Sequence, residues 1–179
     1  MPHLDLKTIS GNQVHLSRTW KPEAFADTQE EDYCFVGEVC LAGDVRKASD
    51  EYRLVGELSA DLGVPCSRCL EPFRLCVETP FDVLYVPQDR NRGEGEREIA
   101  EEDLGIAFYA DEVIDLGQLV REQCYLALPM KPLCRVACRG LCPQCGTNLN
   151  VATCDCRPDW VDPRLEPLRR LRRKSDRTE

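Results

Sequence analysis

The sequence predicts an α+β protein that is mainly β: an antiparallel meander forming a sandwich or open barrel, with a helix, a small cysteine-rich zinc module and a C-terminal helix. Three segments in the first half alternate apolar and polar residues, which is typical of strands with one buried face. A later segment has apolar residues at helical spacing. Six of the twelve cysteines then fall between Cys134 and Cys156, which indicates a separate metal-binding module.

The composition excludes several classes of protein. With 42% hydrophobic and 31% charged residues over 179 positions, the chain is not wholly disordered. No run reaches the ~18 consecutive apolar residues that a membrane helix needs. The first residues carry no apolar stretch after basic residues, so we expect no secretory signal and a cytoplasmic protein. A formal net charge of −9 argues against binding nucleic acid through overall charge.

The predicted strands run from Tyr33 to Leu41, from Tyr52 to Val64 and from Phe73 to Tyr85. Short connections rich in glycine, aspartate and proline separate them, as expected for consecutive antiparallel strands. Residues 88–103 are almost entirely polar and mostly acidic where charged, which predicts a loop. The segment from Ile106 to Val113 resembles a further strand.

A helix is predicted from Asp115 to about Leu128. Asp115 is a residue type favoured at the N-cap, and Pro129 ends the helix because proline cannot continue it. We therefore divide the chain into a β-rich body, residues 1–128, and a zinc-binding module with a basic helix, residues 129–179.

The last predicted helix starts at Asp162-Pro163, or near Glu166 because Pro167 would otherwise interrupt it. It ends in basic residues, although the protein as a whole is acidic. Guanidinium groups pair with phosphate and stack on bases, which favours RNA contact. The alternative is a solvated helix end, where the helix dipole favours positive charge. The candidate RNA-binding residues are Arg169, Arg170, Arg172, Arg173 and Lys174.

The cysteine spacing predicts a zinc ion near the end of the cluster. The turn Cys142-Pro-Gln-Cys145 presents two thiolates to one ion, and Gly146 lets the backbone turn with a positive φ. A second close pair returns after eight residues as Cys154-Asp-Cys156. The first predicted site is therefore formed by Cys142, Cys145, Cys154 and Cys156.

A second zinc site, stapling the module to the body, is predicted from Cys66, Cys69, Cys134 and Cys138. The register stays open, since Cys138 could replace Cys154 or Cys156 in the first site. An iron–sulfur cluster and redox-active thiols are alternatives. Four thiolates fill every position around a tetrahedral zinc ion, so we expect structural ions and no enzyme. We interpret the remaining cysteines as small buried hydrophobic residues: Cys34, Cys40, Cys76 and Cys124.

Several ordered motifs resemble one family. The segment Cys66-Ser-Arg-Cys-Leu-Glu-Pro-Phe73 resembles the central signature of the YceD family, the large ribosomal RNA subunit accumulation proteins. The segment from Cys138 to Asn150, followed by Cys154-Asp-Cys156, is similar to the cysteine-rich variant of that family. The resemblance spans roughly Tyr33 to Leu171, and Pro167 departs from it.

The resemblance implies a non-enzymatic bacterial or plastid factor that supports accumulation of large-subunit ribosomal RNA and ribosome assembly. As partners we expect pre-ribosomal large-subunit RNA or ribosomal proteins, and neither a membrane nor a small-molecule substrate. The acidic body would attract a basic ribosomal protein. The alternative function is a redox-controlled zinc-thiolate chaperone, in which oxidation ejects zinc and exposes apolar surface.

Overall fold

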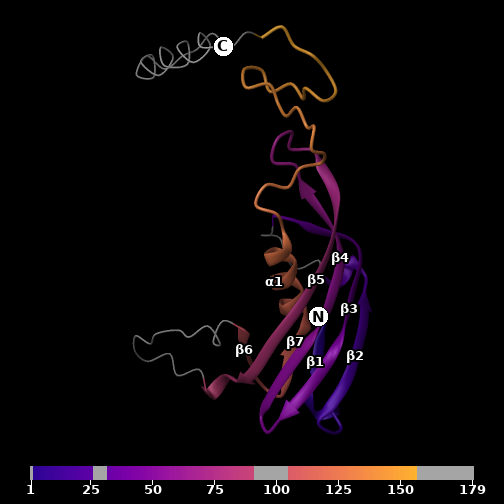
Figure 1. Ribbon diagram of the computed structural model, residues 1–179, viewed down its shortest axis with the longest axis vertical. Coiled ribbons are helices and arrows are strands. Elements are labelled where there is room, and N and C mark those ends of the chain that lie inside the picture. Colours follow the sequence, from indigo (N-terminus) through magenta and orange to yellow (C-terminus); the bar gives the residue numbers. More distant parts are fainter. Residues whose placement is uncertain (1, 26–31, 91–104, 157–179) are drawn as a thin grey trace, which may run out of the picture. The chain divides into compact units, whose positions relative to one another are not determined.

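A computed structural model describes residues 2–25, 32–90 and 105–156 (Figure 1). The chain forms two compact units. The first comprises Met1–Cys66 with Glu71–Cys134, and the second comprises Ser67–Leu70 with Arg135–Glu179. The predicted division at residue 128 stays a prediction. The predicted C-terminal helix, with its candidate RNA-binding residues, and most of the predicted acidic loop lie outside the described residues.

The first unit is built on a five-stranded sheet with the order β2-β3-β4-β5-β6. The pairs from β2 to β5 are antiparallel, which confirms the predicted mainly β fold and its meander. β6 instead pairs parallel with β5, which the sequence did not predict. The described sheet does not close, since β2 and β6 are its two edges. The strands are β2 (Gln13–Trp20), β3 (Cys34–Ala48), β4 (Glu51–Pro65), β5 (Pro72–Pro87) and β6 (Ile106–Tyr109).

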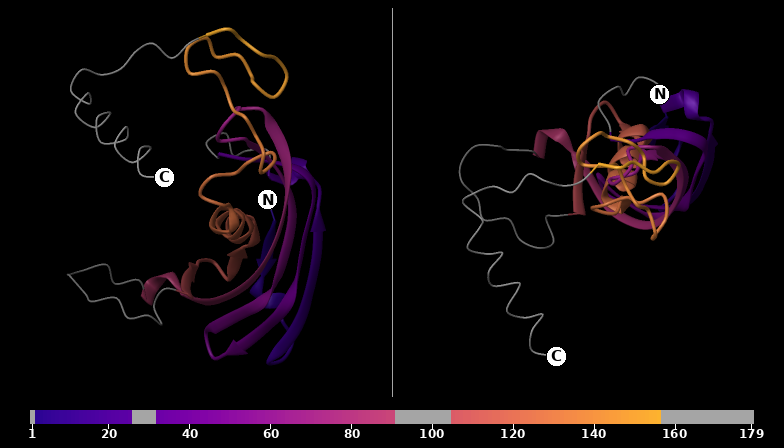
Figure 2. Two further views of the ribbon diagram at one scale, coloured as in Figure 1. Left: turned by 45° about the horizontal axis from the view of Figure 1, so that its top comes forward. Right: turned by 90° about the horizontal axis from the view of Figure 1, so that it is seen from above.

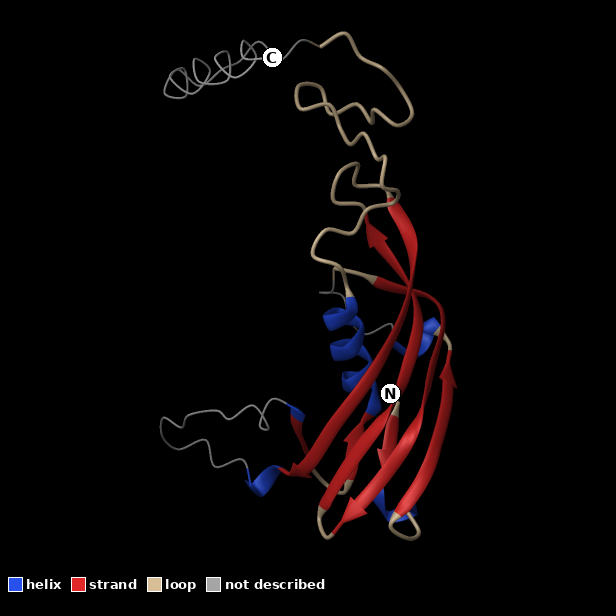
Figure 3. Ribbon diagram, viewed as in Figure 1, coloured by secondary structure: helices blue, strands red, loops and turns tan. Residues whose placement is uncertain are grey.

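Smaller elements complete the first unit. β1 (His3–Asp5) pairs antiparallel with β7 (Val113–Asp115) in a two-stranded sheet. Helix α1 (Leu116–Ala127) packs against β4 and β5, and the large sheet curls around it (Figures 2 and 3). Within the described ranges, no helix combines the length and apolar character needed to cross a membrane. The short 3-10 helices are η1 (Leu6–Thr8), η2 (Pro22–Phe25) and η3 (Gln88–Arg90).

The predicted alternation places one face of the sheet in the core. The large or apolar residues at alternating positions of β4 are buried: Tyr52, Leu54, Leu58, Ala60, Leu62 and Val64. Leu58 on β4 is 1% exposed and lies between Leu41 on β3 and Thr79 on β5. Each inward residue therefore removes apolar surface from water, which is the main favourable term in folding.

Helix α1 confirms the predicted helix and its start. Asp115 is the N-cap, and its Oδ1 accepts a hydrogen bond from the backbone N–H of Gln118 at 2.9 Å. This bond satisfies a backbone donor that has no partner within the helix. Leu116, Leu119 and Val120 are at most 1% exposed, so the apolar side of the helix fills the hollow of the sheet.

The structure contradicts the predicted burial of three of the four isolated cysteines. Cys124 on α1 is buried as expected, but Cys34, Cys40 and Cys76 are exposed. The reason is strand geometry: Cys40 lies opposite Ser59, in the polar half of the alternation that faces solvent. Their position in the strand, and not the usual burial of cysteine, decided their exposure.

The second unit has very little regular structure in its described part. Figure 3 draws residues 135–156 as loop. An isolated β-bridge pairs Leu141 with Asn148. Its buried residues among those described are Cys69, Cys138, Gly140 and Cys142, while Val136 and Val151 are 93% and 85% exposed. This unit does not bury an apolar core over the described residues.

Candidate metal centres

Cys142 and Cys145 lie on a tight turn in the second unit. The backbone N–H of Gly146 donates to the Cys142 carbonyl at 2.9 Å, and that of Cys142 donates to the Thr147 carbonyl at 2.8 Å. Gly146 has φ +73°, a conformation that residues with a Cβ rarely adopt, as its place after Cys145 predicted. These backbone hydrogen bonds therefore hold Cys142 and Cys145 close together.

The second pair returns to this turn. The Sγ atoms of Cys142, Cys145, Cys154 and Cys156 all lie within 4.8 Å of one another. Four sulfurs around a zinc ion at Zn–S distances of about 2.3 Å would be separated by about 3.8 Å, so a small contraction would complete a tetrahedron. We call these four residues the distal quartet. Its donor set consists only of sulfur, which fits a soft or borderline ion such as zinc.

Electrostatics within the distal quartet favours a cation. Hydrogen bonds from the side chain and backbone of Thr147 lower the pKa of the Cys145 thiol to about 6. The Cys145 Sγ and Thr147 Oγ1 atoms are 3.1 Å apart. Hydrogen bonding to the Cys145 sulfur, together with desolvation, raises the pKa of Cys156 to about 12. A negative charge on one thiolate thus makes ionisation of a neighbouring thiol less favourable. A divalent cation would offset this repulsion and stabilise all four thiolates.

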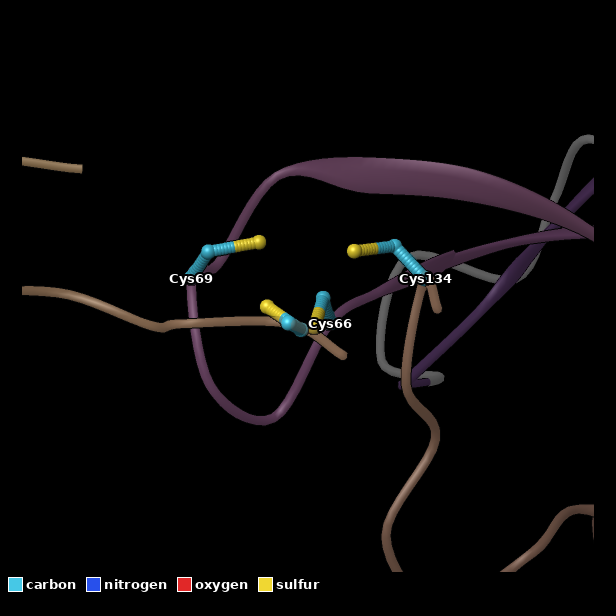
Figure 4. Close-up of side chains that lie close together, drawn as sticks. Cys66, Cys69 and Cys134 are labelled. Carbon is cyan, nitrogen blue, oxygen red and sulfur yellow. The ribbon is translucent and has the colours of Figure 1, made fainter. Parts of the chain in front are cut away.

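The other predicted cysteines also come together. The Sγ atoms of Cys66, Cys69, Cys134 and Cys138 all lie within 4.8 Å of one another. Figure 4 shows the sulfur atoms of Cys69 and Cys134 directed toward each other, with Cys66 beside them. We call these residues the proximal quartet. Cys138 is thus grouped with Cys66 and not with Cys154 or Cys156, the alternative that the sequence left open.

The two quartets differ in their exposure to solvent. In the proximal quartet Cys66, Cys69 and Cys138 are buried and Cys134 is half-buried. In the distal quartet Cys142 is buried, Cys154 is half-buried, and Cys145 and Cys156 are exposed. Solvent, chelators and oxidants therefore have better access to the distal sulfurs.

Sequence reasoning missed two polar side chains that hydrogen-bond to Cys138. Arg68, between Cys66 and Cys69, donates from Nη1 to the Cys138 carbonyl at 2.9 Å, and its own carbonyl accepts from the N–H of Leu141 at 3.1 Å. Asn150 donates from Nδ2 to Cys138 Sγ at 3.3 Å. The signal in the sequence was the position of these polar residues between or next to predicted ligands, where second-layer hydrogen bonds are expected.

Comparison of the sequence with known proteins identifies one matching family. The sequence model of the family described as large ribosomal RNA subunit accumulation protein YceD matches residues 54–172. That range contains all eight cysteines of the two quartets. No solved structure matches the chain.

Relatives come from bacteria and plants. An uncharacterized protein of Mycobacterium tuberculosis is 35% identical over 124 residues, covering 69% of this chain and 57% of the relative. The large ribosomal RNA subunit accumulation protein YCED homolog 1, chloroplastic, of Zea mays is 27% identical over 154 residues, covering 73% of this chain and 52% of the relative. The chain therefore spans little more than half the length of these relatives.

Proposed function

The chain belongs to the YceD family of large ribosomal RNA subunit accumulation proteins, and from this premise we propose that it supports the accumulation of large-subunit ribosomal RNA as a non-enzymatic assembly factor. The observation that carries the proposal is the match of the family's sequence model, which extends over both cysteine quartets. The plant relatives bear the corresponding name, which links this family to the same RNA.

Each quartet holds one zinc ion in this proposal. Thiolates are the ligands of structural zinc, and two sets of four sulfurs lie close enough to bind one ion each. The second unit buries no apolar core over its described residues, so coordination would supply the energy that orders it. Four protein ligands leave no position for a reactive water, which supports a structural role and no enzymatic activity.

The partner is pre-ribosomal large-subunit RNA or a ribosomal protein, and the protein acts in the cytoplasm. RNA contact would come from the basic segment Arg169 to Lys174, which lies outside the described residues. The net charge of −9 supports a different partner, a basic ribosomal protein, because opposite charges accelerate encounter.

The test is performed in cells that produce this protein and on the full chain. Depletion should lower the amount of large-subunit relative to small-subunit ribosomal RNA, and the purified chain should carry two zinc ions. The protein should sediment with large-subunit precursors in a gradient. Truncation after Leu168 should weaken RNA binding and flatten its salt dependence if the basic segment contacts phosphates. An unchanged ratio of the two RNAs after depletion would refute the proposed function.

The distal quartet supports a redox-controlled zinc-thiolate chaperone as the second candidate. Cys145 and Cys156 are exposed, and the lowered pKa of Cys145 favours the thiolate, the form that oxidants attack. Mild peroxide should then release zinc and increase the suppression of aggregation of a test protein. Retained zinc and unchanged suppression would remove this candidate.

A further inference from the structure

The side chain of Asn150 makes four polar contacts with described residues of the second unit. Its Oδ1 accepts from the backbone N–H of Arg139 at 2.9 Å and from Nη2 of Arg135 at 2.8 Å. Its Nδ2 donates to Cys138 Sγ at 3.3 Å and to Oδ1 of Asn148 at 2.9 Å. Because two donors occupy the oxygen end of the amide, the NH₂ end is the one that faces the sulfur.

A hydrogen bond to a ligating sulfur has a defined chemical effect. An N–H donor stabilises the thiolate and fixes the direction of its lone pairs. Such groups behind the ligands change metal affinity by about 10–100-fold when they are removed. Asn150 is placed to have this effect on Cys138, a member of the proximal quartet.

Asn150 itself belongs to the segment that closes the distal quartet. That segment runs from Cys145 to Cys154, so both of its ends are distal cysteines. Inside it, the N–H of Leu149 donates to the Gly140 carbonyl at 2.9 Å, and the N–H of Ala152 donates to the Asn148 carbonyl at 3.0 Å. No residue of the segment is buried. An ion at the distal quartet would therefore order the loop that carries the donor for Cys138.

We propose that Asn150 is a positioning residue that couples ion binding at the two quartets. Binding at the distal quartet fixes the loop, Asn150 then donates to Cys138, and the proximal quartet binds its ion more tightly. Linkage makes the coupling reciprocal, so an ion at the proximal quartet also tightens binding at the distal one. This inference rests on the proposed zinc ions and adds that they are not bound independently.

The test compares the full chain with an Asn150→Asp variant. Aspartate keeps the oxygen that accepts from Arg139 and Arg135, but an anionic oxygen replaces the NH₂ group that donates to Cys138 and to Asn148. Cadmium is used as the probe, because NMR detects each tetrathiolate ion as a separate resonance. Competition with a chelator then gives the affinity of each quartet. In the Asn150→Asp variant, the proximal affinity should fall by about 10–100-fold.

A double-mutant cycle measures the coupling itself. The distal quartet is removed by Cys145→Ser with Cys154→Ser. This change should weaken cadmium binding at the proximal quartet by about 10-fold or more when Asn150 is present, as expected for loss of one such donor. It should have little effect in the Asn150→Asp background. Equal weakening in both backgrounds, or no weakening in either, overturns the proposal.

Two controls separate coupling from simple loss of folding. The first control removes the proximal quartet by Cys69→Ser with Cys138→Ser. In that chain, Asn150→Asp should leave the cadmium affinity of the distal quartet unchanged. If the distal affinity instead falls by about 10–100-fold, Asn150 only supports the loop, and the proposal is overturned. The second control is Gln144→Glu, which adds the same charge on an exposed residue of the distal turn and should preserve the coupling.

If the unsubstituted chain binds no ion at either quartet, the proposal of two zinc sites is itself refuted. If it binds both ions without coupling, only the inference fails.

Discussion

The two units of the chain bury different kinds of side chain. The first buries a contiguous apolar cluster contributed by the large sheet and α1, whereas the described part of the second buries three cysteines and one glycine. Hydrophobic burial can therefore account for the first unit but not for the second. The comparison teaches that the second unit needs a source of stability other than apolar burial, and the metal coordination that we propose for it would respond to different perturbations.

Removal of metal should have the largest effect, in the second unit and next to Cys66 and Cys134, the two proximal cysteines that belong to the first unit. Binding of a structural zinc ion has an apparent free energy of about 10–16 kcal/mol, and that energy becomes folding energy where no apolar core exists. With chelator present, hydrogen exchange should show loss of protection at the amides of Cys142 and Leu149, which are hydrogen-bonded here. The amides of β4 should remain protected.

Two matched serine variants sharpen this prediction. Cys142→Ser removes a distal ligand and should have the local effect of the chelator, whereas Cys40→Ser changes an exposed thiol on β3 and should have none. Protected amides at Cys142 and Leu149, in protein shown by metal analysis to hold no ion, would contradict the comparison.

Truncation in the apolar core should have the next largest effect and should be confined to the first unit. Leu58 is 1% exposed, so Leu58→Ala should lower the free energy of unfolding by about 2–5 kcal/mol through lost burial and a residual cavity. Both ions should be retained. Val36→Ala, at a residue that is 50% exposed, should change stability by less than about 0.5 kcal/mol. Thermal unfolding with metal analysis checks both, and loss of metal from the Leu58→Ala protein below its transition would argue that the units are not independent.

The comparison also explains what could be predicted from the sequence. The alternation from Tyr52 to Val64 records which residues face the core, so β4 and its buried face could be predicted. Asp115 was recognisable because an N-cap depends on one side chain and its own helix. Short spacings predicted the close pairs of cysteines, but they left open whether Cys138 joins the pair of Cys154 and Cys156, and the structure instead groups it with Cys66.

Other features depend on contacts that a local pattern does not record. β2 was missed because Arg18, an exposed residue at the sheet edge, follows Val14 and Leu16 on the same face and breaks the apolar alternation. The parallel pairing of β6 with β5 depends on the path of the intervening chain. The contact of Asn150 with Cys138 joins residues whose side chains meet only once the turns have formed.

Loss of the helix cap should have a moderate effect within the first unit. Asp115→Ala removes the acceptor for the Gln118 N–H and should lower stability by about 0.5–2 kcal/mol. Asp115→Asn is the matched control, because asparagine is an equally good N-cap, and it should restore most of the loss. Chemical unfolding of the three proteins measures the difference. An Asn variant as unstable as the Ala variant would show that the charge of Asp115, and not its capping bond, is what matters.

The smallest effect should come from the solvent-facing side of the large sheet. Arg53 donates from Nε and Nη2 to the two carboxylate oxygens of Asp82 at 2.8 and 2.6 Å, yet both side chains remain about half exposed, at 58% and 46%. Hydrogen bonds from Arg53 lower the pKa of Asp82 in the folded state. The Asp82 carboxylate therefore stabilises the folded state at pH values above its unfolded pKa of about 3.9. That stabilisation is lost as the pH falls through the lowered pKa of the folded state. Asp82→Asn should therefore be slightly less stable at neutral pH, with the difference shrinking in high salt and vanishing in acid. Urea midpoints between pH 7 and pH 2 would measure it. A difference as large as that of Leu58→Ala would mean that the polar face, and not the apolar one, stabilises the first unit.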